Sequence, residues 1–295
     1  CLTGPARQHP AKSKGRQPPR RLPALLAQQS ADRPGNESSA GEPQDEDRRI
    51  GGTGLIGRQL GQGLGSIGHD VVAASPSTGV DAMTGEGLDR AFAAADVVVD
   101  VSNSPSFADN EVLRFFETST GNILKAADKA GIRHYVALSV VGSDRVPDSG
   151  YLRAKLAQER SISSGPIPWT IVRATQFFEF LGAIAQSGAE GDIIYLSPAK
   201  FQPIASADVA MALLQVCLAP PENGVVELAG PDAFSMAKLV QRYLVATGDV
   251  RKVVPDADAR YFGALLNDRS LMPGVNPRLG ATSFAQWVEK AVPGG

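Results

Sequence analysis

The hydrophobic positions of the chain follow two alternating patterns from residue 51 onward. Residues 55–64 carry apolar side chains at helical spacing, and residues 70–74 follow as a short apolar run. The valine-rich run at 96–101 is typical of a strand buried on both faces. A long amphipathic helix is expected over 112–130, and Gly131 stands where a left-handed cap would end it.

The alternation of short apolar runs with amphipathic segments continues to residue 174. The further elements expected are a helix around 88–95, a strand at 135–141, a helix at 152–164 and a strand at 169–174. Strands that alternate with helices in this way form a parallel sheet with helices packed on it. The sequence therefore predicts an α/β protein with a doubly wound, Rossmann-type sheet.

The pattern beyond residue 176 is more mixed. The elements expected there are a helix at 176–186, a strand at 193–196, a helix from about 207, a strand at 225–228, and helices at 236–247 and 284–291. We expect a small C-terminal substrate lobe, formed mainly by residues 176–295, beside the sheet.

The first 49 residues have a different composition. Prolines are scattered among Arg, Gln, Ser and Gly, a mixture that cannot bury enough apolar surface to fold. We expect a disordered tail over residues 1–49 and a folded domain over residues 50–295.

Three glycines open the helix expected at 55–64. The spacing of Gly51, Gly54 and Gly57 suits a tight turn, a close backbone approach and close helix packing. Together with Leu55 and Ile56, these residues would present backbone N–H groups and a positive helix end to a pyrophosphate. The motif indicates a dinucleotide-binding loop.

The strand that should precede this glycine loop is not evident. Residues 44–50 are mostly charged and cannot form the central strand of a parallel sheet. The only upstream apolar run is 22–27, and Pro23 and the long polar spacer make it a poor substitute. We expect the first strand to be missing or replaced, with poor folding or weak cofactor binding as the result.

The residues after the second strand bear on the choice of cofactor. Ser75, Ser77 and Thr78 stand where a carboxylate would select NAD, and their hydroxyls could bond a 2′-phosphate. NADP is therefore favoured and NAD is the alternative; the hydroxyls could equally form only a turn. We also assign Asn103, in the turn after the strand at 96–101, to the cofactor site.

A Tyr and a Lys stand four residues apart, the Tyr directly before the range 152–164 expected as a helix and the Lys within it. Tyr151 and Lys155 then share one helix face and can act on one ligand. Tyr151 would exchange a proton with a substrate oxygen, and Lys155 would favour the phenolate and bond the cofactor ribose. Ser139, at the end of the preceding strand, would hydrogen-bond the same oxygen, with Ser143 as an alternative.

These motifs resemble the short-chain dehydrogenase/reductase superfamily, and more narrowly its atypical, NmrA-like branch. The resemblance covers about residues 51–286 and includes Tyr135-Val-Ala-Leu-Ser139, Ile167-Pro-Trp-Thr-Ile-Val-Arg173 and Glu227-Leu-Ala-Gly-Pro231. It implies an NAD(P)-binding Rossmann fold, with activities that include quinone and isoflavone-type reduction and, in other members, non-catalytic redox sensing.

Three functions follow as alternatives. The first is an NADP-preferring oxidoreductase that reduces a carbonyl or quinone on a small apolar substrate, with Gln176 and Phe177 lining the substrate site. The second is a non-catalytic NAD(P)-binding redox sensor, and the third is a truncated family member without activity. Arg173 is either a buried structural cation or a cofactor contact.

Composition narrows the class of partner. The chain has a formal net charge of −2, so it has no overall positive field to attract nucleic acid. No run approaches the ~18 apolar residues of a membrane span. The histidines have no partners at metal-ligand spacing, and His134 is expected at the surface. Its two cysteines suggest no disulfide framework, which favours a cytoplasmic location.

Overall fold

The computed structural model describes residues 24–26 and 54–291 of the chain. Its centre is a seven-stranded sheet in which every neighbouring pair is parallel. Across the sheet the strands are β12 (Arg278–Leu279), β9 (Gly224–Ala229), β5 (Trp169–Ala174), β4 (His134–Val140), β3 (Val97–Asp100), β1 (Ala24–Leu26) and β2 (Val72–Ala74).

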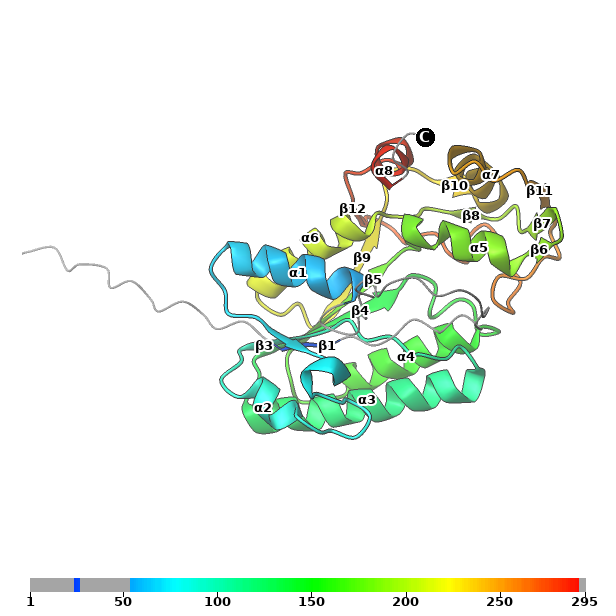
Figure 1. The fold of residues 1–295 in the computed structure, drawn as a ribbon. Helices are drawn as coiled ribbons and strands as arrows, with labels where there is room; N and C mark the ends of the chain where they lie inside the picture. Colours follow the sequence, from blue (N-terminus) through cyan, green and yellow to red (C-terminus); the bar gives the residue numbers. More distant parts are fainter. Residues whose placement is uncertain (1–23, 27–53, 292–295) are drawn as a thin grey trace, which may run out of the picture.

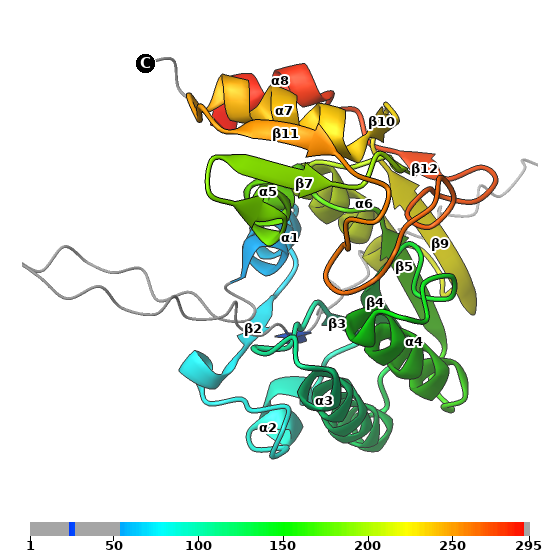
Figure 2. The same ribbon diagram turned by 90° about the vertical axis from the view of Figure 1, so that its right-hand side faces the viewer.

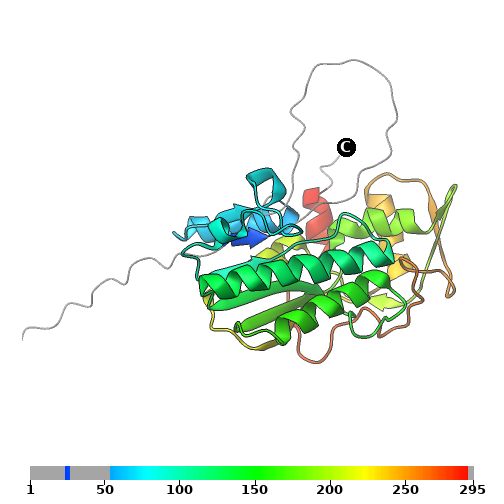
Figure 3. The same ribbon diagram turned by 90° about the horizontal axis from the view of Figure 1, so that it is seen from below.

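Helices cover both faces of this sheet. Helices α1 (Leu55–Ser66) and α6 (Ser206–Leu218) lie on one face, and α2 (Leu88–Phe92), α3 (Asp109–Ala130) and α4 (Gly150–Ser163) lie on the other (Figure 1). The long helices α3 and α4 run side by side, as Figure 3 shows from below. This arrangement confirms the predicted doubly wound, Rossmann-like fold.

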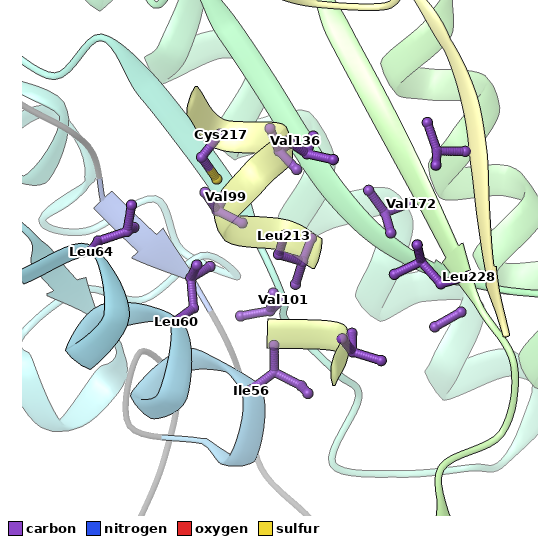
Figure 4. Packing of buried hydrophobic residues seen from close by; sticks show 14 of the residues in the cluster. Ile56, Leu60, Leu64, Val99, Val101, Val136, Val172, Leu213, Cys217 and Leu228 are labelled. Carbon is purple, nitrogen blue, oxygen red and sulfur yellow. The ribbon is translucent and has the colours of Figure 1, made fainter. Parts of the chain in front are cut away.

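The face beneath α1 and α6 holds one of the main hydrophobic cores (Figure 4). Side chains of α1 meet those of α6 and the apolar side chains of the central strands; those labelled are Ile56, Leu60, Leu64, Val99, Val101, Val136, Val172, Leu213, Cys217 and Leu228. Burial raises the pKa of the Cys217 thiol to about 12, so Cys217 packs as a small apolar side chain.

Strand β1 corrects one prediction. Ala24–Leu26 lies between β2 and β3 and pairs with both, so Leu25 stands opposite Ala73 on one side and Val99 on the other. The first strand is therefore replaced by this run rather than missing, and the expected disorder of residues 1–49 is wrong for these three residues. Pro23 itself lies outside the described residues.

The other residues of the predicted tail, together with Gly51 of the glycine loop, lie outside the described residues. The strand order reverses between β1 and β3, because β2 lies beyond β1 while β4 lies beyond β3. In open parallel sheets, ligands bind at the carboxyl ends of the strands at such a reversal. We therefore expect a ligand to bind at the segments that follow β1 and β3.

A second core lies beside the sheet. It is built from η3 (Phe178–Phe180), α5 (Leu181–Ser187), β6 (Ala189–Glu190), β7 (Ile193–Leu196), β8 (Lys200–Phe201), β10 (Phe234–Ser235), α7 (Met236–Ala246), β11 (Lys252–Pro255) and α8 (Phe284–Ala291). We call this the lobe. Helix α6 and strand β9 fall between these elements in the sequence, but β9 is a strand of the main sheet and α6 packs on that sheet. Within the described residues, no helix is long and apolar enough to cross a membrane.

Candidate active site

Helix α1 begins directly after Gly54, whose extended backbone (φ −67°, ψ 174°) makes it the N-cap. No side chain caps this helix end, and the first turn has no acidic residue. The first N–H groups of a helix have no partner within the helix, so Leu55, Ile56 and Gly57 offer donors to an anion. The observed end of α1 fits the pyrophosphate of a dinucleotide.

The hydroxyls after β2 bond to one another. Ser75 is buried, and its Oγ lies 2.9 Å from Ser77 Oγ. Thr78 Oγ1 accepts from the Ser75 N–H at 2.9 Å and lies 2.9 Å from the Ala73 carbonyl oxygen, to which it can donate. These contacts build the short 3-10 turn η2 (Pro76–Thr78), which favours the turn alternative for Ser75, whereas Ser77 stays exposed.

Asn103 lies in the segment that follows β3, at the carboxyl end of the strand. Its Oδ1 accepts a hydrogen bond from the Ser104 N–H at 3.0 Å, and the side chain is partly buried. The carboxyl end of β3 is one side of the reversal in strand order. Its place in the fold therefore agrees with the cofactor role assigned to it, which stays a prediction.

Tyr151 lies in the first turn of α4, close to the carboxyl edge of the sheet. Its ring packs against Phe107, with ring centres 5.6 Å apart, and against Phe116 at 6.2 Å. No described residue is hydrogen-bonded to its hydroxyl. Burial raises the pKa of Tyr151 well above its usual value, so the group is a neutral phenol that holds its proton.

Lys155, one turn further along α4, is directed into the protein. Its Nζ donates to the Leu138 carbonyl oxygen at 2.8 Å and to Gln158 Oε1, and lies 4.4 Å from the centre of the Phe116 ring. Burial lowers the pKa of Lys155 to about 8, against the opposing charges of Asp100 and Glu159. The ammonium therefore bonds protein groups, and its expected contact with a ribose stays a prediction.

The carboxylate of a buried ion pair, Glu159 with Arg173, accepts hydrogen bonds from two serines at and after the end of β4. Ser139 Oγ donates to Glu159 Oε1 at 2.5 Å, and Ser143 Oγ donates to the same oxygen at 3.2 Å. Arg173 donates to Glu159 through Nε at 2.9 Å and Nη2 at 2.6 Å, and also pairs with Asp144 at 3.0 Å. The hydrogen bonds that Arg173 donates to Glu159 are the main cause that raises the pKa of Arg173.

Two consequences follow for the predicted roles. Arg173 is a structural cation, because its guanidinium is paired with carboxylates on both sides. The proton of Ser139 is held by Glu159, so a hydrogen bond from Ser139 to a substrate oxygen requires that contact to break. The role of Ser139 in substrate binding stays a prediction.

Asp100, the last residue of β3, is hydrogen-bonded to side chains of β4 and α4. Its Oδ1 accepts from the Ser102 N–H at 3.0 Å and from Ser102 Oγ at 2.6 Å. Its Oδ2 accepts from Tyr135 Oη and Gln158 Nε2, both at 2.9 Å. The sequence analysis did not identify Asp100 or Glu159 as members of this site. For Glu159 one indication was available: it lies four residues after Lys155 and therefore on the same helix face.

The residues assigned to substrate follow β5. Gln176 is 7% exposed, and its Oε1 has no hydrogen-bond partner among the described residues. Phe177 packs on the main core and stacks on Phe180, with ring centres 5.6 Å apart and planes at 16°. Phe178 turns the other way and is buried in the core of the lobe. The chain thus passes from the sheet to the lobe at these residues.

His134 differs from its expected surface position. It is 3% exposed, and its Nε2 lies 2.9 Å from Thr170 Oγ1 on the neighbouring strand. Burial lowers its pKa to about 4, so the ring is neutral and structural. A neighbouring strand covers it, which local sequence could not indicate. The described part of the chain has no group of three or more His, Cys, Asp or Glu side chains arranged to hold a metal.

Comparison with solved structures shows the same fold in several proteins. A dTDP-4-dehydrorhamnose reductase from Clostridium acetobutylicum is 17% identical, with a TM-score of 0.61 over 81% of this chain and 95% of that chain. A short-chain dehydrogenase/reductase superfamily protein from Agrobacterium tumefaciens, solved with NAD, is 18% identical, with a TM-score of 0.59 over 82% and 94%.

A third similar structure is the NADPH-dependent quinone oxidoreductase from Escherichia coli, solved with NADPH. It is 20% identical, with a TM-score of 0.52 over 70% of this chain and 76% of that chain. No curated protein matches the chain.

A family model described as NAD(P)H-binding matches residues 51–220, which is more than half of the chain. The match spans the glycine loop, α4 and β5, the segments that carry most of the site. It confirms the expected NAD(P) cofactor and agrees with the resemblance to atypical short-chain dehydrogenases/reductases. The chain belongs to this NAD(P)H-binding family.

Proposed function

We propose that the protein is an NAD(P)H-dependent reductase of a carbonyl or quinone on a small apolar substrate, with a preference for NADP. Tyr151 carries the proposal: it is a neutral phenol at the carboxyl edge of the sheet, with no hydrogen-bond partner among the described residues. A phenol whose proton is not held by a protein acceptor is suited to protonating a bound oxygen.

In this proposal each residue has one task. When bound, NAD(P)H supplies a hydride, which carries both electrons of the reduction. Tyr151 gives its proton to the substrate oxygen, and a proton from water restores the phenol, so the product is an alcohol or a hydroquinone. Lys155 and Ser139 would support the ribose and the same oxygen after releasing their present protein partners.

The cofactor and the substrate would meet beside Tyr151, so that the hydride passes directly from one to the other. The helix end at Gly54, Leu55, Ile56 and Gly57 would hold the pyrophosphate, with Gly51 completing the loop. Gln176 and Phe177 would contact the substrate. The unpaired Oε1 of Gln176 supports this assignment, because a buried amide oxygen needs a donor and a ligand could supply it.

The preference for NADP rests on the residues after β2, which include no carboxylate at the position where one would bond a ribose 2′-OH. Ser77 is exposed beside the buried Ser75 and could bond a 2′-phosphate. A small-molecule partner and a cytoplasmic location complete the proposal, and both rest on composition.

A second candidate is a redox sensor that binds NAD(P) without turnover. The direction of Lys155 favours it, since this amine bonds Leu138 and Gln158 instead of facing the phenol. A sensor would still use the glycine loop and would have no need of a proton donor.

Cofactor titration followed by turnover assays separates these candidates. NADPH and NADH are titrated by fluorescence, and the protein is then assayed with NADPH against a panel of aldehydes, ketones and quinones. The reductase proposal expects tighter binding of NADPH than of NADH, with turnover of at least one class. Binding without turnover would favour the sensor, and no binding of either cofactor would contradict both.

A further inference from the structure

The segment after β11 returns from the lobe to the main domain. In Figure 2 this orange segment runs from β11 toward the ends of β4 and α4. The Arg145 side chain donates to the Arg269 carbonyl oxygen at 3.0 Å, which ties the segment to the turn after β4. Gly142 lies so close to Ser270 that a Cβ at position 142 would collide with the Ser270 carbonyl oxygen.

The tip of this segment is a tight turn. Tyr261 and Ala264 exchange two backbone hydrogen bonds, of 2.8 and 3.1 Å. The two residues between them are left-handed, with φ of 44° at Phe262 and 90° at Gly263, as in a type I′ turn. Positive φ is rare for a bulky residue such as Phe262, so the surrounding contacts hold the turn in one conformation.

This turn packs beside Tyr151. Ala264 is fully buried in the same small cluster as Leu152 and Val146, and Tyr151 packs against that cluster. Two half-exposed rings flank the pair of tyrosines: Phe107 contacts Tyr151, and Phe262 contacts Tyr261 with ring centres 4.8 Å apart. The turn therefore brings a second phenol and a second exposed ring to the proposed proton donor.

The two phenols are alike in one respect that bears on ligand binding. In the described part of the chain, neither the Tyr151 nor the Tyr261 hydroxyl has a hydrogen-bond partner, although both side chains are at least partly buried. Burial and then the neighbouring Tyr151 raise the pKa of Tyr261, so both groups are neutral donors. Two phenol donors, each beside a half-exposed ring, fit a planar ligand with two oxygen acceptors.

We propose that Tyr261 is a substrate-binding residue which, together with Tyr151, selects a planar conjugated substrate with two oxygens, of the quinone class. This inference rests on the proposed reductase function and narrows its substrate. Tyr151 would protonate one oxygen, and Tyr261 would donate a hydrogen bond to the other. The half-exposed rings of Phe107 and Phe262 would lie against the ring of the substrate.

The test compares two ligands with the same fused ring system. Menadione has two carbonyl oxygens and naphthaldehyde has one. Their binding to the protein is measured by equilibrium dialysis, with and without NADP⁺, so the readout is independent of turnover. Tyr261→Phe should weaken menadione binding by roughly 5- to 10-fold, the effect of one lost hydrogen bond, and leave naphthaldehyde binding unchanged.

Tyr243→Phe is the matched control, because it removes a phenol from the lobe near Trp287 instead of near Tyr151. It should change neither affinity. Steady-state assays with NADPH should show a raised KM for menadione in Tyr261→Phe with little change in kcat. Both variants keep the ring, and their melting temperatures verify the fold.

Equal loss of affinity for both ligands, or no loss for menadione, would overturn the role of Tyr261. Parent protein that binds menadione no better than naphthaldehyde would overturn the quinone assignment. Failure of the reductase proposal has a different signature: the parent would bind NADPH or menadione and turn over no substrate.

Discussion

Helix α4 places its polar groups in two different surroundings. Toward β4 and β5, Lys155 and Glu159 each bond several protein groups. At the start of the helix, the Tyr151 hydroxyl bonds no described residue. Polar groups that stabilise a fold are usually saturated by protein partners. The contrast therefore separates the part of α4 that holds the sheet together from the part left open to a ligand.

The largest effect on stability is expected from a substitution among the α4 side chains that are hydrogen-bonded to the protein. Glu159→Gln removes the buried carboxylate of Arg173 and leaves only the more exposed Asp144, which should lower the free energy of unfolding by roughly 3–5 kcal/mol. Urea denaturation measures this loss. Glu117→Gln, on an exposed position of α3, is the control and should have no effect. A loss below about 1 kcal/mol would show that the pair contributes little to stability.

The open side is tested by Tyr151→Phe. Removing the hydroxyl should lower kcat by ~10²-fold or more, as expected for a general acid, while the Kd for NADPH stays near that of the parent. The melting temperature should hardly change, because the hydroxyl has no protein partner to lose. Tyr195→Phe removes a phenol from β7 as a control. Unchanged turnover in Tyr151→Phe would end its assignment as proton donor.

The pH dependence of stability tests the burial of Lys155. Its pKa falls to about 8 in the folded protein, whereas the unfolded chain keeps the usual value near 10.4. Between these values the unfolded state binds more protons, so stability should rise with pH, on the order of 2 kcal/mol. The measurement is the difference in unfolding free energy between the parent and Lys155→Met from pH 7 to 10. A difference that stays flat would mean that Lys155 is well solvated.

The smallest effect concerns the hydroxyls after β2. Ser77→Asp places a carboxylate on an exposed position, and it should shift the ratio of NADPH to NADH affinity by roughly 10-fold toward NADH through repulsion of the 2′-phosphate. Thr84→Asp adds the same charge to another exposed position as a control. An unaltered ratio would mean that these hydroxyls bond only one another, like the saturated groups of α4.

Patterns of apolar residues predicted the main elements well. The bounds of β5, β7 and α8 agree with the expected ranges, and Gly131 ends α3 in the left-handed conformation as expected. Long periodic segments can be recognised from the local sequence, because the residues of the buried face must be apolar. Strand β1 is not predictable in this way, because Pro23 and a long polar stretch before the glycine loop argue against it, and its pairing with β2 and β3 is not visible locally.

The site was only partly predictable for the same reason. The spacing of Tyr151 and Lys155 placed them on one helix, as α4 confirms. Spacing alone could not indicate that Lys155 faces Gln158, or that Glu159 would hold Ser139. Tyr261 had no signal beyond a glycine two residues later, because its position beside Tyr151 depends on a contact between distant parts of the chain.

Gly142 shows how much can depend on a residue that has no side chain. At this point the returning segment and the main domain touch backbone to backbone, because the Ser270 carbonyl oxygen occupies the space that a Cβ at position 142 would need. A single added methyl group at position 142 would therefore force the two parts of the chain apart. A substitution at Gly142 would thus displace the segment that carries Tyr261 from the domain that carries Tyr151, and it would resemble an active-site defect although position 142 supplies no functional group.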